Sequence, residues 1–250
     1  GSQNAWLIKT DSNGDTLWTN TYYDTTCTTC GARANAVEQT SDGGYILAGG
    51  TNLVKTDSLG NEEWFITINS YVEDVIHTAD GGYVVAGGGN DFKLNKVDSL
   101  GNEVWSHSWD SGGEVDDQCY SVDMTNDGGF ILTGFTAPYG ESHRDLWLIK
   151  TDSTGTAGWK VNYGGDLYDS GWDVEQTGDG NYIVLGTTRS YGTGGTTDAW
   201  LLKVRESHVY HVATTGSDST GDGSEDNPFA TIQHGINAAS DGDTVLVAAG

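Results

Sequence analysis

Short runs of alternating hydrophobic and polar side chains dominate the chain. The stretch from Ala5 to Thr10, AWLIKT, places every second side chain on the same face, which is the period of a β-strand. A polar turn follows, in which Gly14 supplies the left-handed backbone that tight hairpins need. The pattern predicts two antiparallel strands joined by this turn over residues 5–22.

The same strand–turn–strand pattern returns later, and a second pattern lies between its copies. The first reads LVKTDSLGNEEW from Leu53, LNKVDSLGNEVW from Leu94, LWLIKTDSTGTAGW from Leu146 and, shortened, WLLKV from Trp200. The second contains an Asp-Gly turn and reads VEQTSDGGYILAGG from Val37, VIHTADGGYVVAGG from Val75, VDMTNDGGFILTGF from Val122 and VEQTGDGNYIVLGT from Val174. The copies recur every ~40–55 residues, which is the range of propeller blades.

Each pair of patterns predicts four short antiparallel strands, the unit of one β-propeller blade. The sequence therefore predicts an all-β chain with about four to five blades, each burying its faces against its neighbours. The blades are expected at about 33–70, 71–110, 116–164 and 170–206, with a partial blade at 5–22. The fourth set has no clear last strand. We expect one domain over 1–206 and a second over 207–250.

One tryptophan recurs at the start of the fourth strand of each set. A large ring at this place can fill the space between neighbouring blades. We therefore expect packing rather than ligand contact for the four copies Trp18, Trp64, Trp105 and Trp159.

The two ends of the blades differ in their connections. One end carries only Asp-Gly and Asp-Ser-x-Gly turns, whereas the other has long connections at 24–33, 110–117, 137–144, 164–170 and 189–197. Because scaffolds keep function on loops, this variable end near the third and fourth blades is the expected binding face. The candidate ligand-binding residues are Tyr139, His143, Arg144, Tyr168 and Tyr191. The tyrosines can stack on sugar rings, and core packing is favoured for Trp172.

The chain is strongly acidic, with a formal net charge of −25 and only 11 Lys and Arg. This balance argues against partners that need a basic surface, namely nucleic acid and anionic membranes. No apolar run is long enough for a membrane helix, and we expect no signal peptide within these residues. The charge suits a soluble protein in a salty or calcium-containing medium. A solvated surface with no specific partner is the competing interpretation.

Acidic side chains gather in two loops of the variable end. Calcium prefers such oxygen ligands, whereas exposed loop carboxylates with no metal are the alternative. The candidate calcium ligands are Asp110, Glu114, Asp116 and Asp117 in one loop, and Asp166 and Asp169 in the next. No other cofactor is expected.

Cysteine is sparse. A zinc site usually needs four ligands, and Cys27 and Cys30 form the only close pair. We expect a local disulfide between these two residues, and a buried, small hydrophobic side chain at Cys119.

The pattern changes after about residue 206. We expect a strand at 208–212, a polar loop at 216–227, a short helix within 228–239 and a strand at 244–247. Two strands and a helix do not bury a core alone. They either dock on the repeats or begin a domain that continues in a longer protein.

The repeat, with its DGGYI and WLIKTDSxGxxxW elements, resembles the β-propeller repeats of secreted and cell-surface proteins of bacteria and archaea over about residues 5–204. It lacks the Gly-His and Trp-Asp pair of WD repeats. It also lacks the Ala-x-Asp-x-x-Thr-Gly form of the tryptophan-docking repeats of quinoprotein dehydrogenases. The segment from Tyr210, YHVATTGSDSTGDGSEDNPFATIQHGINAASDGDTVLVAAG, resembles the cap and first rung of right-handed parallel β-helices of the pectin-lyase-like type. Such β-helices are often carbohydrate-active or adhesive.

These patterns favour a non-enzymatic function, because no nucleophile, base and metal constellation is visible. The main hypothesis is an extracellular or cell-surface structural or adhesion module that assembles through incomplete blades into oligomers or filaments. Its expected partners are copies of itself, other surface proteins or glycans. The alternative is an ancillary or catalytic part of a secreted carbohydrate-active enzyme, with glycans bound on the variable end.

Overall fold

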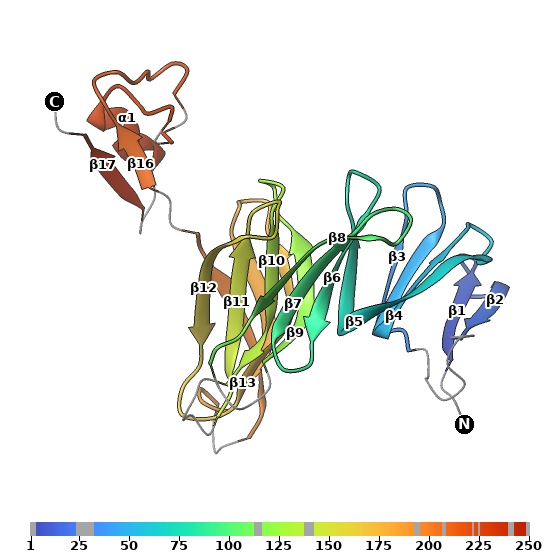
Figure 1. Ribbon diagram of the computed structural model, residues 1–250. Helices are drawn as coiled ribbons and strands as arrows, with labels where there is room; N and C mark the ends of the chain where they lie inside the picture. The colour runs from blue at the N-terminus through green and yellow to red at the C-terminus, as the bar shows by residue number, and fades with distance from the viewer. Residues whose placement is uncertain are drawn as a thin grey trace. The chain divides into compact units, whose positions relative to one another are not determined.

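The computed structural model describes residues 4–23, 33–112, 117–137, 143–192, 196–206, 209–221, 223–224, 226–239 and 243–248. The chain divides into two compact units, 1–203 and 204–250. Across these described ranges, no helix is long and apolar enough to cross a membrane. The first unit consists of β-strands (Figure 1), whose bounds are β1 (Ala5–Thr10), β2 (Thr16–Tyr22), β3 (Ala36–Gln39), β4 (Tyr45–Thr56), β5 (Glu62–His77), β6 (Tyr83–Gly88), β7 (Phe92–Val97), β8 (Glu103–Trp109), β9 (Gln118–Met124), β10 (Phe130–Thr136), β11 (Asp145–Thr151), β12 (Ala157–Tyr163), β13 (Asp169–Gln176), β14 (Tyr182–Thr188) and β15 (Asp198–Val204).

The strands pair as the repeats predict. Strands β1 and β2 form the expected antiparallel hairpin, with Ala5 opposite Tyr22. Strands β9 to β12 form a four-stranded antiparallel sheet, the third blade, whose strands lie side by side in Figure 1. Strands β13, β14 and β15 form a three-stranded sheet, the fourth blade, and its doubtful last strand is absent from the described residues.

The first and second blades are joined into one six-stranded sheet, β3 to β8, instead of two separate sets of four. The reason is the shortness of two connections. Strand β4 is one continuous strand that contains both the second and the third strands of the first blade. Its two ends lie together, because a Cβ added at Gly44, just before β4, would collide with the carbonyl oxygen of Thr56, its last residue. Strand β5 pairs with β4 through Thr67 and with β6 through Val72, and thus serves both blades.

Hydrophobic side chains between blades form the core. We define the forward face of a blade as the one turned to the next blade, and the rear face as the opposite one. The forward face of the first blade, with Ile46 and Leu53, packs on the rear face of the second, with Val75 and Tyr83. The second and third blades repeat this contact. Burial at these joints, at about 25 cal/mol per Å², holds the blades together.

The four repeated tryptophans confirm the packing prediction. Each ring contacts an aromatic ring of the next blade at 5.8–6.1 Å, in the pairs Trp18–Tyr45, Trp64–Tyr83, Trp105–Phe130 and Trp159–Tyr182. The rings also cover turn glycines, because a Cβ at Gly155 would lie 2.7 Å from the Trp105 ring. Gly155 has a φ of +80°, so this position needs glycine for its backbone as well as for its space.

A lysine on the third strand of each blade binds the aspartate of the Asp-Gly turn. The Nζ atom of Lys150 lies 2.8 Å from Asp127 Oδ2 and also donates to the carbonyl of Thr151. Lys55 and Lys96 make the same contact with Asp42 and Asp80 at 2.8 and 3.0 Å, and all three lysines are buried. We did not predict these pairs.

Among the described residues of the first unit, the fourth blade is covered on its rear face and not on its forward face. Val174 is buried against the third blade, as Val75 and Val122 are at their joints. On the forward face, Leu185 and Leu201 are 48% and 66% exposed.

The second unit contains β16 (Val209–Val212), α1 (Ile232–Ala238) and β17 (Thr244–Val247). Strands β16 and β17 pair in parallel. The helix is shorter than the expected segment of 228–239, because Phe229 forms a parallel bridge with Val212 and Thr231 is the N-cap. The β-helix assignment of this unit stays a prediction.

Candidate functional site

A hollow of about 540 Å³ lies at the variable end, where three long connections meet. Two of the predicted ligand-binding residues, Arg144 and Tyr168, line it together. The other described lining residues are Ser170, Thr187, Arg189 and Thr197. The third and fourth blades contribute all of them, and the location of a binding face here stays a prediction.

Arg144 is held by an aromatic ring. Its guanidinium carbon lies 4.1 Å from the centre of the Phe135 ring, within the range of a cation–π interaction. Phe135 is itself buried. The Arg144 carbonyl accepts a hydrogen bond from the backbone N–H of Asp169 at 2.6 Å. Both the backbone and the side chain of Arg144 are therefore fixed by neighbouring strands.

Arg189 is fixed from two sides. Its Nε donates to Thr197 Oγ1 at 2.9 Å, and its guanidinium carbon lies 5.7 Å from the Tyr168 ring centre. Its backbone N–H donates to the carbonyl of Tyr168 at 3.0 Å. Within the described ranges, neither Arg144 nor Arg189 forms an ion pair with a carboxylate.

A row of aromatic rings continues the wall of the hollow. Trp172 stacks on Tyr120 with ring centres 4.5 Å apart, and Tyr120 lies 5.8 Å from Phe135. The indole N–H of Trp172 donates to Thr187 Oγ1 at 3.0 Å. Burial raises the pKa of Tyr120, and the charge of Arg144 opposes that rise, which places the guanidinium within electrostatic reach of the row.

The expectation of core packing for Trp172 is wrong. Its side chain is 47% exposed. The pairing of β13 with β14 shifts between Gly171 and Asp173, and such a bulge redirects the extra side chain. Trp172 is therefore a surface ring beside the hollow.

Of the other predicted ligand-binding residues, the two that are described, His143 and Tyr191, do not line the hollow. His143 Nε2 lies 3.9 Å from Asp145 Oδ1. The Tyr191 hydroxyl donates to the carbonyl of Gly164 at 2.5 Å, and its exposed ring lies 5.3 Å from Trp200. Tyr139 lies outside the described residues.

Two of the predicted calcium ligands, Asp117 and Asp169, accept hydrogen bonds from loop residues. Asp117 is buried and accepts from the backbone N–H and the hydroxyl of Ser111 at 2.7 and 2.9 Å, and from Ala137 N–H at 3.0 Å. Asp169, the equivalent residue of the next blade, accepts from Ser190 Oγ at 2.6 Å. Asp110 and Asp166 are exposed, and Glu114 and Asp116 lie outside the described residues. In the described part of the chain, no three His, Cys, Asp or Glu residues gather as a metal site.

Of the cysteines, only Cys119 is described, and Cys27 and Cys30 lie outside that part of the chain. Cys119 is a free, buried thiol whose sulfur lies 3.5 Å from the Thr133 carbonyl. Burial raises the pKa of this thiol well above its usual value. It behaves as the small hydrophobic side chain that we expected.

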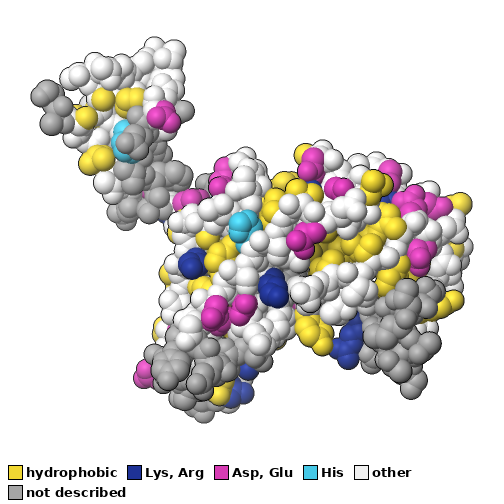
Figure 2. Space-filling model, viewed as in Figure 1, with side chains coloured by type: hydrophobic (Ala, Val, Ile, Leu, Met, Phe, Trp, Pro, Cys, Tyr) yellow, Lys and Arg dark blue, Asp and Glu magenta, His cyan; other side chains and the backbone are white. Residues whose placement is uncertain are grey.

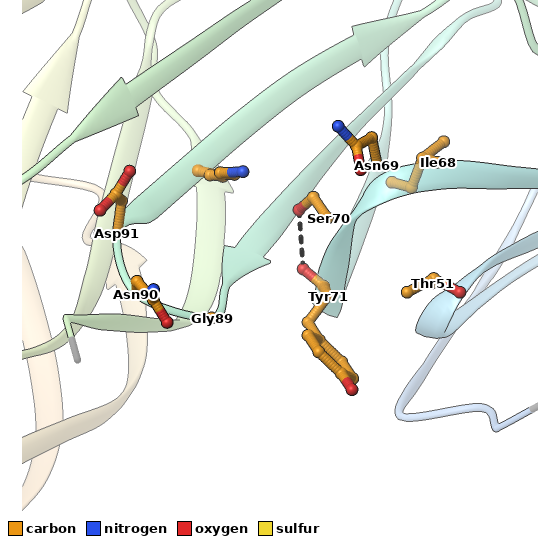
Figure 3. Close-up of a pocket in the computed structure, with 9 residues that line it drawn as sticks. Thr51, Ile68, Asn69, Ser70, Tyr71, Gly89, Asn90 and Asp91 are labelled. Carbon is orange, nitrogen blue, oxygen red and sulfur yellow. Dashed lines mark hydrogen bonds between the residues drawn. The ribbon is translucent and has the colours of Figure 1, made fainter.

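A second hollow, of about 390 Å³, lies between the first and second blades at the same end. Figure 3 shows its lining residues, with the exposed ring of Tyr71 projecting away from Ile68 and the Ser70 hydroxyl bonded to the Tyr71 carbonyl at 2.9 Å. Loop length did not predict this hollow, because the connections that border it are short. Asp91 and Lys93 bring opposite charges to it, so it has no preference for one sign of ligand.

The Arg144 hollow differs from the surface around it in charge. Lys and Arg side chains are few on the face shown in Figure 2, as expected from 11 of them against 36 Asp and Glu in the chain. Among the described residues of the hollow, the two arginines are the only charged groups. The other described side chains are serine and threonine hydroxyls and the Tyr168 ring. The hollow therefore offers hydrogen-bond donors to an anion, and its described residues lack the acid, base or activated nucleophile that would cleave a bond.

The comparisons with known proteins establish the fold of the first unit. No family model and no curated protein matches the chain. A solved protein of unknown function from Bacteroides caccae is similar at a TM-score of 0.51 and 13% identity, over 82% of this chain and 73% of that chain. The β-propeller domain of Cps50 (Swd1) from Myceliophteria thermophila is similar at a TM-score of 0.50 and 9% identity, over 84% and 70%. These identities show the fold alone, and that fold is a β-propeller, as the repeats predict.

Proposed function

We propose that the chain is a non-enzymatic, extracellular or cell-surface adhesion module that binds its partners at the variable end of its β-propeller. One observation carries this proposal. Arg144 and Arg189 line the same hollow and have no carboxylate partner in the described part of a chain with a net charge of −25. In so acidic a chain, two arginines that line one hollow without a carboxylate ion-pair partner are available to an external anion.

The chemistry of the hollow supports binding rather than catalysis. Glycoside hydrolysis needs two carboxylates about 5–9.5 Å apart, and acyl transfer needs a nucleophile with an adjacent base. The described lining residues contain neither a carboxylate nor a histidine. Guanidinium, hydroxyl and ring groups instead offer hydrogen bonds and apolar surface, which are the means of recognition.

Loop shortening tests this proposal. In the second blade, the connection that corresponds to 189–197 has only three residues, Gly89, Asn90 and Asp91. Replacing 189–197 by Gly-Asn-Asp would remove Arg189 and Thr197 while leaving β14 and β15 in place. We expect the wild-type chain to adhere to at least one of a panel of immobilised cell-envelope and matrix polymers, and the shortened chain to lose that adhesion.

Lys160→Gln is the matched control, because Lys160 is an exposed cation on β12 that does not line the hollow. It should adhere as the wild type does. Equal adhesion by the shortened and wild-type chains, or no adhesion of the wild type to any polymer, would contradict the proposal. Circular dichroism melting within a few degrees of the wild type shows that the shortened chain is folded.

Self-association is a second candidate, favoured by the exposed forward face of the fourth blade. At every joint within the chain, a forward face packs on a rear face. The β1–β2 hairpin covers part of the rear face of the first blade, where Leu47 and Val54 pack on Ala5 and Tyr22. Val37, on the same face, is 54% exposed, whereas the equivalent Val75 is 4% exposed. The uncovered part of this rear face in a second copy, around Val37, is therefore the candidate partner for Leu185 and Leu201. Such a head-to-tail contact forms a ring if the rotation between copies closes and an open filament if it does not.

The small apolar area of this contact determines the protein concentration at which we expect copies to associate. Burying two leucines contributes about 3–6 kcal/mol, which is less than the ~8 kcal/mol of a micromolar complex. Light scattering should show association only near millimolar protein, and Leu201→Glu should abolish it. Leu59→Glu, at an equally exposed leucine of a turn, should not. A chain that stays monomeric at these concentrations would rule out the candidate.

A further inference from the structure

We propose that the Arg144 hollow binds the carboxylate of an acidic sugar unit in a polysaccharide. This inference rests on the proposed function, because it names the partner of the same site. The two guanidinium groups would receive the carboxylate, the hydroxyl side chains would bond the sugar hydroxyls, and the aromatic rings would cover the apolar face of the sugar ring.

The arginines are preorganised for an anion. A guanidinium presents parallel N–H donors that match a carboxylate, and such charge-assisted pairs are stronger than neutral hydrogen bonds. Arg144 rests on the buried Phe135 ring at 4.1 Å, and Arg189 is anchored by Thr197 at 2.9 Å. Because both side chains are already ordered, binding loses little additional side-chain entropy.

The neutral groups of the hollow favour a sugar over a polypeptide. Tyr168, which lines the hollow, and Trp172, which lies beside it through its bond to Thr187, are 48% and 47% exposed, and each can present a ring to an apolar surface. The hydroxyls of Ser170 and Thr187 lie at the same hollow. A sugar ring combines an apolar face with a rim of hydroxyls, whereas an acidic peptide offers carboxylates on flexible chains. The hollow also falls within the ~300–1,000 Å³ of ligand pockets.

Isothermal titration calorimetry with three probes tests the ligand class. The probes are an oligomannuronate, the same oligomer with its carboxylates methyl-esterified, and a polyglutamate peptide, in a calcium-free buffer of low salt. We expect the oligomannuronate to bind, with the ester and the peptide each at least about tenfold weaker, since one charge-assisted hydrogen bond is worth about tenfold or more.

Variants assign the binding to the hollow. Arg144→Gln and Arg189→Gln should each weaken oligomannuronate binding about tenfold or more. Lys160→Gln removes the same charge elsewhere and should leave the affinity unchanged. Melting temperatures close to the wild type's show that the two arginine variants are folded.

Each contrary result has a distinct meaning. Equal binding of the esterified oligomer, or equal binding by the arginine variants, would overturn the carboxylate assignment. Polyglutamate binding as tight as that of the sugar would replace the sugar by an acidic polypeptide. If no probe binds while loop shortening still abolishes adhesion, the ligand class is wrong and the proposed function stands. If the probe binds but loop shortening leaves adhesion intact, the site stands and the proposed function is wrong.

Discussion

The third and fourth blades carry the same sequence pattern in different surroundings. Leu148 and Leu201 both lie two residues before the repeated lysine, yet Leu148 is fully buried and Leu201 is 66% exposed. Lys150 and Lys203 both bind a turn aspartate, but the side chain of Lys150 is 5% exposed and that of Lys203 is 56% exposed. The pattern thus specifies the blade, whereas burial depends on the neighbouring blade, as in other repeat proteins.

Truncating the two leucines should give the largest difference between these blades. Leu148→Ala removes a fully buried side chain and should lower the free energy of unfolding by about 3 kcal/mol. Leu201→Ala should change it by less than about 0.5 kcal/mol, because little burial is lost. Denaturant unfolding of both variants measures the difference. Equal losses would show that the forward face of the fourth blade is covered in solution.

Turn glycines should give a smaller difference. Gly14 and Gly155 both have positive φ, at +89° and +80°, so alanine is strained at either position. A Cβ at Gly155 would also lie 2.6 Å from the His107 ring, whereas one at Gly14 has nothing within 4 Å. We expect Gly155→Ala to cost about 1–2 kcal/mol more than Gly14→Ala, measured by thermal unfolding. Equal costs would mean that the ring moves aside freely.

Acid titration should reveal the smallest effect. Burial opposes ionisation of Asp127, but hydrogen bonds from Lys150 and Thr125 lower its pKa to about 2. Because the unfolded pKa is about 3.9, the stabilisation is present above pH 4 and is lost as the pH falls to 2. For a partly exposed pair we expect about 0.5–1 kcal/mol.

The variant Lys150→Met isolates this pair. It should lower stability at pH 7 and flatten the loss between pH 4 and pH 2, as seen in urea midpoints at each pH. Lys160→Met, on the outer strand of the same blade, should keep the wild-type slope. An unchanged slope in Lys150→Met would assign the acid sensitivity to other carboxylates.

Local features of this fold could be predicted from the sequence, and features that depend on register could not. The hairpin at 5–22 and the packing of the tryptophans follow from patterns within a few residues. The pair of Lys55 with Asp42 joins residues that are both visible in the repeats, but their contact depends on the fold of β4. The exposure of Trp172 depends on a shift of register at Gly171, and although a glycine inside a strand can mark a bulge, the residue types do not show which side chain the bulge redirects.

The candidate site shows the same division. Arg144 and Tyr168 were predicted because loop length marks the variable end. Arg189 was missed, although it opens one of the long connections that we identified. Arg189 belongs to the site because its side chain contacts Tyr168 and Thr197. These contacts depend on the folded structure and are not visible in the sequence. Charge offered a usable signal, because cations are scarce in this chain and two of them flank adjacent long loops.

The contact between the tryptophan of one repeat and the turn glycine of the next has a consequence for how the number of repeats can change in evolution. Each complete repeat carries a ring that covers the next repeat's turn and a turn that accepts the previous repeat's ring. A gene duplication that copies one repeat in tandem therefore delivers both halves of the one new joint that it creates. Blade number can change by whole units with no compensating substitution elsewhere, while the long loops diverge independently on the opposite end.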